Sequence, residues 1–163
     1  MSFHYEKDSN NIVTVTMDMD GPVNSMSDAF LPALEATLGK LEADADLAGV
    51  ILASGKSTFF AGGDLNMLCA VTEETVEAFF EGMCATKAAM RRLEKLHAPV
   101  CAAINGAALG GGLELALSCH HRIAWNNRSV QLGFPEVTLG LLPGGGGNVK
   151  AVYLMGLMAA NEY

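Results

Sequence analysis

Short apolar runs alternate with segments of helical periodicity along this chain, and the alternation limits the fold more than any other feature. The apolar runs predict strands at residues 3–6, 12–17, 47–53, 99–104, 122–125 and 129–132. Helical spacing predicts helices over residues 27–43, 73–96, 111–118 and 148–158. Ser27 and Thr72 are predicted to cap the first two. Because the strands look apolar on both faces, we expect an α/β fold with partly parallel pairing.

The length and composition fit a single domain over residues 1–163. Half of the residues are hydrophobic and 17% are charged, which excludes a disordered chain. Asp and Glu number 18 against 10 Lys and Arg, giving a net charge of -8. Because phosphate binding needs clustered basic residues, this balance argues against a nucleic-acid partner. An acidic protein can still bind one anion through backbone N–H groups.

The four cysteines, Cys69, Cys84, Cys101 and Cys119, form no CxxC pair and lie in apolar segments. This pattern indicates reduced thiols in a cytoplasmic protein and predicts no metal site. The N-terminus is polar and mixed in charge, unlike a signal peptide. The apolar stretch 98–119 is interrupted by proline, asparagine, glutamate and glycines, so we predict no membrane span.

Two glycine-rich loops follow apolar runs, at residues 59–65 (FFAGGDL) and 105–114 (NGAALGGGLE). Adjacent glycines let a ligand approach the main chain and leave N–H groups free to donate. For the first loop taken alone, an ordinary strand-to-helix turn is the favoured interpretation. The second loop places three glycines at a helix start, which favours an anion or an oxygen that becomes negative during a reaction. It matches neither a Walker nor a Rossmann pattern.

Two acidic residues stand alone in apolar, glycine-rich surroundings. Glu136 is the only acid in residues 132–147, and Glu114 lies in an otherwise apolar helix start. Burial would raise the pKa of such a carboxyl and keep it partly protonated. The two residues are therefore either an acid/base pair or, for Glu136, a solvated loop acid.

Five segments carry a resemblance to a known family. They are GPVNSMS at 21–27, FAGGDL at 60–65, NGAALGGG at 105–112, PE at 135–136 and LGLLPG at 139–144. In this order and spacing they resemble the crotonase superfamily, the enoyl-CoA hydratase/isomerase family. The chain looks most similar to the N-terminal hydratase domain of multifunctional fatty-acid oxidation proteins.

The resemblance implies a crotonase-like (ClpP/crotonase) spiral of ββα units and an oxyanion hole formed by the N–H groups of Gly63 and Gly111. Glu114 and Glu136 match the two glutamates of true hydratases, which add water to a 2-enoyl-CoA in fatty-acid β-oxidation. We expect Glu114 to act as the base towards water, because it lies near a helix N-terminus. Glu136 follows Pro135 in an apolar loop, which favours the neutral acid.

The resemblance also implies that coenzyme A binds as part of the substrate, with no separate cofactor. The residues that it assigns to thioester binding are Val23, Asn24, Met26, Ala61, Gly62, Asp64, Leu65 and Gly110. Lys56 is either a phosphate ligand in this region or a solvated loop lysine.

The sequence departs from the family at its end. Family domains continue past the position of Tyr163, so we expect the chain to lack the C-terminal helices that cover the acyl pocket and build oligomer contacts. Exposed apolar surface there could support a homo-oligomer, and the parent chains continue into a 3-hydroxyacyl-CoA dehydrogenase module. Isomerisation, thioester hydrolysis and silent acyl-CoA binding remain alternatives to hydration.

Overall fold

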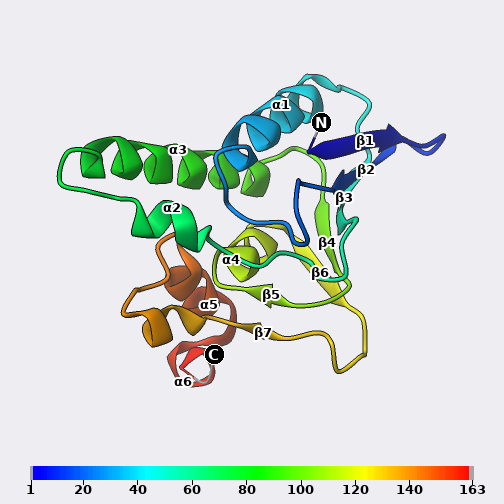
Figure 1. Ribbon diagram of the computed structural model, residues 1–163. Helices are drawn as coiled ribbons and strands as arrows, with labels where there is room; N and C mark the ends of the chain where they lie inside the picture. Colours follow the sequence, from blue (N-terminus) through cyan, green and yellow to red (C-terminus); the bar gives the residue numbers. More distant parts are fainter. Residues whose placement is uncertain (1, 162–163) are drawn as a thin grey trace.

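A five-stranded sheet forms the centre of the fold in the computed structural model, which describes residues 2–161 (Figure 1). Its strands are β1 (Phe3–Lys7), β2 (Ile12–Met17), β3 (Gly49–Ser54), β4 (Val100–Ile104) and β6 (His121–Ala124), in the spatial order β1-β2-β3-β4-β6. The β1–β2 hairpin is antiparallel and every other pair is parallel. This confirms the predicted α/β class with partly parallel pairing.

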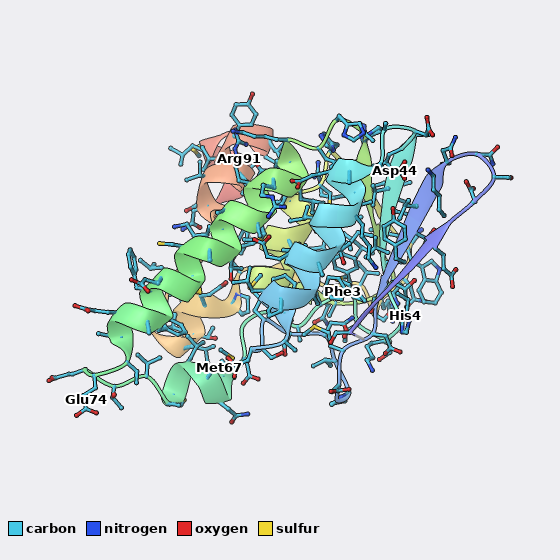
Figure 2. The ribbon with its side chains drawn as sticks, turned by 90° about the horizontal axis from the view of Figure 1, so that it is seen from above. Phe3, His4, Asp44, Met67, Glu74 and Arg91 are labelled. Carbon is cyan, nitrogen blue, oxygen red and sulfur yellow. The ribbon has the colours of Figure 1, made fainter. Side chains whose placement is uncertain are left out.

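Two long helices cover one face of the sheet. They are α1 (Phe30–Ala43) and α3 (Val76–Glu94), which lie side by side above the strands (Figure 2). The core between them contains Val15 and Val100 from the sheet, Phe30 and Leu38 from α1, and Met90 from α3. Burying these side chains supplies most of the stability of such a layered fold.

The opposite face of the sheet is open. Residues of strand β2 alternate between buried and half-buried, as they do in a strand with one solvated face. On the open face Ile51 is 37% exposed and Ile123 is 69% exposed. The prediction that the strands are apolar and buried on both faces is therefore wrong, because helices pack on only one side.

The C-terminal part of the chain forms a second, smaller layer outside the sheet. It consists of β5 (Ala108–Leu109) paired in parallel with β7 (Leu132–Gly133), helix α4 (Gly111–Leu117), the 3-10 turn η1 (Pro135–Leu139), α5 (Gly147–Met155) and α6 (Leu157–Ala160). In Figure 1 this layer lies below α3 and beside α2 (Leu65–Cys69). An apolar hollow of about 420 Å³ lies among η1, α5 and α6. Exposed Val137, Leu142 and Leu157 surround it.

Several predicted helix boundaries differ from those observed. The first helix begins at Phe30 and not after Ser27, because the chain at Met26 is extended in a bridge with Gly63. Thr72 caps no helix: it begins a turn closed by Thr75, and α3 starts at Val76. The short helix α2 was missed.

The predicted last helix is split at Gly156, where φ is +80°. Between residues 2 and 161, no helix is long and apolar enough to cross a membrane.

Candidate active site

The backbone amides of Gly63 and Gly111 lie on two adjacent loops. Phe60 and Ala108 form a parallel bridge, and a Cβ on Gly62 would lie 3.5 Å from the nitrogen of Gly111. In the segment 2–161 no carbonyl accepts a hydrogen bond from either amide. Two neighbouring N–H groups without an internal acceptor are the donors that an oxyanion hole requires.

Glycine is needed beside these amides because the chain is left-handed there. Gly62 has φ +102° and its carbonyl accepts the N–H of Met26 at 2.8 Å. Gly110 has φ +52° and precedes the first residue of α4. Residues with side chains rarely adopt these backbone angles, so glycine at both positions allows the turns that precede the two donor amides.

Glu114 is buried on α4, with 3% of its surface exposed. Its Oε1 accepts a hydrogen bond from the N–H of Gly147 at 2.8 Å, at the start of α5. Its Oε2 lies against Gly145, where a Cβ would come within 2.5 Å of that oxygen. The glycine-rich turn between η1 and α5 therefore encloses the carboxyl and leaves no room for side chains of its own.

Glu136 lies half-buried in the first turn of η1, after Pro135. Its Oε1 packs against Gly110, where a Cβ would come within 2.8 Å. Its Oε2 is buried without a hydrogen-bond partner among residues 2–161. Burial raises the pKa of Glu136, and the nearby charge of Glu114 raises it further. A buried, unpaired carboxyl oxygen of raised pKa fits a proton donor.

The titration of Glu136 provides a first test. We expect its pKa to lie above the ordinary glutamate value, and Glu114→Gln to lower it, because the variant removes a neighbouring negative charge. In that variant, burial should still keep the pKa of Glu136 above the ordinary value. A raised carboxyl pKa favours folding at low pH, and this contribution is lost as pH rises through the folded-state pKa.

Carboxyl carbon NMR across a pH series measures both shifts. Glu81→Gln, on the exposed surface of α3, is the matched control. A Glu136 titration at the ordinary value, or one unmoved by Glu114→Gln, would show that the two carboxyls do not share a site.

Of the predicted thioester-binding residues, Met26, Gly62 and Gly110 lie close to Gly111, and the side chains of the set differ in what they do. The Sδ of Met26 lies 2.8 Å from the position of a Cβ on Gly111. Asp64 caps α2 by accepting the N–H of Asn66 at 2.9 Å. Ala61 and Leu65 are exposed, whereas Val23 is half-buried. Binding of coenzyme A by these residues stays a prediction.

Lys56, which the sequence left open as a phosphate ligand, is paired within the chain. Its Nζ lies 2.6 Å from Oδ1 of Asp18. The partner carboxyl would compete with any phosphate for this ammonium group.

Asn24 is fully buried and ties the first loop to the sheet. Its Nδ2 donates to Ser54 Oγ at 2.9 Å and to the carbonyl of Met17 at 3.1 Å, and its Oδ1 accepts the N–H of Met19 at 3.0 Å. Its carbonyl accepts the N–H of Ala61 at 2.8 Å. The side chain therefore fixes the position of Asn24 against the sheet, and its backbone carbonyl links that position to the loop that carries Gly62 and Gly63.

Replacing Asn24 should be costly. We expect Asn24→Ala to lower the free energy of unfolding by about 3 kcal/mol, because it leaves buried backbone groups unpaired and opens a cavity. Urea denaturation measures this, with Asn66→Ala on the exposed face of α2 as control. Equal stability of the two variants would contradict the structural role of Asn24.

Sequence reasoning missed the role of the glycines at 144–147. They are four in a row, yet no pattern indicated that Gly147 would donate to Glu114 or that Gly145 would pack on it. Phe134 was missed as well: its ring lies 2.4 Å from where a Cβ on Gly147 would be. Among the residues from 2 to 161, no group of three His, Cys, Asp or Glu is placed to hold a metal ion.

A family model described as enoyl-CoA hydratase/isomerase matches residues 7–163. Fatty acid oxidation complex subunit alpha of Shewanella loihica is 44% identical over 160 residues, which are 96% of this chain and 22% of the relative. The subunit of the same name from Idiomarina loihiensis is 42% identical over 159 residues, with the same shares. The chain thus spans about a fifth of the length of these relatives.

Solved structures agree with this match. Enoyl-CoA hydratase from Bacillus anthracis aligns with 99% of this chain and 61% of its own, at a TM-score of 0.88 and 34% identity. Enoyl-CoA hydratase from Thermoplasma volcanium aligns with 99% of this chain and 62% of its own, at a TM-score of 0.87 and 28% identity.

The α/β architecture and these matches define a domain of the crotonase superfamily. Within that superfamily, this chain belongs to the enoyl-CoA hydratase/isomerase family. The predicted fold and family resemblance are confirmed.

Proposed function

We propose that this chain carries a 2-enoyl-CoA hydratase site of fatty-acid β-oxidation. The observation that carries the proposal is the grouping of two unpaired backbone amides, Gly63 and Gly111, with two carboxyls in different environments, Glu114 and Glu136. Family members with hydratase names support it. The reaction needs both kinds of group, because it generates a negative thioester oxygen and moves two protons.

The proposed reaction begins with the thioester carbonyl oxygen accepting hydrogen bonds from the two amides. Glu114 takes a proton from water as the water oxygen bonds to the β-carbon. The electron pair of the double bond moves to the carbonyl oxygen, forming an enolate that the amides stabilise. Glu136 then gives its proton to the α-carbon, and the thioester carbonyl re-forms. The sum is addition of one water molecule, and the proton on Glu114 must return to Glu136.

The environments of the carboxyls support this division of roles. Glu114 already accepts one hydrogen bond, from the N–H of Gly147, which holds its carboxyl in place. Glu136 has a buried oxygen without a partner and a raised pKa, which favours its neutral form. Removing one oxyanion donor in such sites typically costs about 3 kcal/mol of barrier.

The runner-up is another reaction of the same family, such as enoyl-CoA isomerisation. Isomerisation needs only one carboxyl that moves a proton between carbons. The presence of two carboxyls in different environments therefore favours hydration. We also propose that the parent protein is a fatty acid oxidation subunit with a dehydrogenase module, because relatives of that name are 42–44% identical.

Mass analysis of the products from crotonyl-CoA tests the proposal. We expect a 3-hydroxyacyl-CoA, heavier than the substrate by one water. A product of unchanged mass from a longer enoyl-CoA, separated from the substrate by chromatography, would establish isomerisation in its place. Free coenzyme A would establish thioester hydrolysis, and unchanged substrate with measurable binding would establish a silent acyl-CoA-binding domain.

A further inference from the structure

A partly buried ionic contact joins the helices that carry Glu114 and Gly147 to α3. The Nζ of Lys150 lies 2.6 Å from Oε1 of Glu94 and 2.5 Å from the hydroxyl of Ser118. Ser118 is fully buried, and the side chains of Lys150 and Glu94 are only 20% and 17% exposed. These three residues come from α5, α4's C-terminal end and α3, so the contact joins three helices.

The contact is connected to both the side chain and the main chain of Glu114. Lys150 lies one turn after Gly147, whose N–H binds Oε1 of Glu114. Ser118 lies one turn after Glu114, and its hydroxyl donates to the Glu114 carbonyl at 2.8 Å. The hydroxyl therefore accepts from Lys150 while donating to the main chain of Glu114.

Helix α5 has few other attachments to this part of the protein. Only Gly147 and Ala151 are buried on it, whereas Val149 and Tyr153 are 75% and 89% exposed. Two small buried residues contribute little apolar contact. The ammonium group of Lys150 is consequently a second polar link between α5 and α4, beside the hydrogen bond from the Gly147 N–H to Glu114. Figure 2 shows Arg91 at the end of α3 that lies near α5.

We propose that Lys150 is a positioning residue that keeps the Gly147 N–H on the Glu114 carboxyl by tying α5 to Glu94 and Ser118. Arg91 also pairs with Glu94, so loss of Lys150 leaves that carboxylate with a partner and the core intact. The catalytic consequence rests on the proposed function, because it requires Glu114 to act on water. The structural consequence, at the Gly147 amide, does not depend on it.

Hydrogen exchange of single amides separates these two consequences. In Lys150→Met we expect the Gly147 amide to exchange about tenfold faster or more, because α5 opens locally, while amides of β4 keep their rates. Lys150→Arg should keep both slow, since Arg can reach the same partners. Lys87→Met, exposed on α3, is the matched control. Unchanged exchange at Gly147, or an equal rise at Gly147 and in β4, would overturn the proposal.

If the chain hydrates crotonyl-CoA, Lys150→Met should lower kcat by about tenfold with KM nearly unchanged, since a misplaced Glu114 affects the proton transfer more than binding. Lys150→Arg should restore kcat. Faster Gly147 exchange with an unchanged kcat would overturn the catalytic half of the proposal. A chain without hydration activity would refute the proposed function, and the exchange result would still decide the role of Lys150.

Discussion

Glu114→Gln and Glu136→Gln are each expected to lower kcat for crotonyl-CoA hydration by about 10² to 10⁴, with a small effect on KM. Gln has nearly the size of Glu but can neither take a proton from water nor release one to carbon. The double variant should lose little more than either single variant, because the reaction cannot be completed without both carboxyls. Loss of the crotonyl-CoA absorbance measures the rates.

The matched control for these variants is Glu81→Gln, which removes one negative charge from the exposed surface of α3. It should keep the parental rate. If either site variant also kept the parental rate, the assignment of that carboxyl would be wrong. A loss confined to Glu114→Gln would show that hydration needs one carboxyl only, and that Glu136 is not its proton donor.

Gly112→Ala is expected to be the most destabilising glycine substitution in α4, by about 3 kcal/mol. An added Cβ would lie 2.2 Å from the carbonyl oxygen of Phe60 and 2.8 Å from its carbonyl carbon. These are backbone atoms next to the bridge between Phe60 and Ala108, so they cannot move without shifting the Gly62–Gly63 loop. Urea denaturation gives the change in the free energy of unfolding.

Gly82→Ala is the matched control for Gly112→Ala, because it is expected to change the free energy of unfolding in the opposite direction. Gly82 lies inside α3, and an added Cβ meets nothing within 4 Å. Replacing an unhindered helical glycine by alanine stabilises by about 0.5–1 kcal/mol. If Gly112→Ala were as stable as the parent, the close approach of the two loops, and with it the paired amides, would be contradicted.

Much of the fold could be predicted because local pattern and tertiary packing agree. The β-branched alternation of residues 12–17 and the apolar run ending at Ile104 became strands, and the glycines before Leu113 began a helix. Helix starts were less predictable. Ser27 has a good capping side chain, but the bridge between Met26 and Gly63 holds that segment extended, so a tertiary contact overrides a local preference.

The candidate site was predictable only in part, for a related reason. Lone acids and glycine-rich loops are visible in the sequence, so Glu114 and Glu136 stood out, whereas Gly63 and Gly111 were assigned by the family resemblance. The hydrogen bond between Gly147 and Glu114 joins residues 33 positions apart and uses a backbone amide, which every residue except proline possesses. Residue identity therefore carried no signal for it, apart from the unexplained run of glycines.

The central claim is that this site adds water to the β-carbon of an enoyl thioester through Glu114 and Glu136. The most direct test follows the oxygen atom: the protein is incubated with crotonyl-CoA in water enriched in the heavy oxygen isotope, and the label is located by fragment mass analysis. We predict label on the β-carbon hydroxyl with the parent protein, and its loss in both Gln variants. Label in a released carboxylic acid, or equal β-carbon labelling in all three proteins, would contradict the claim.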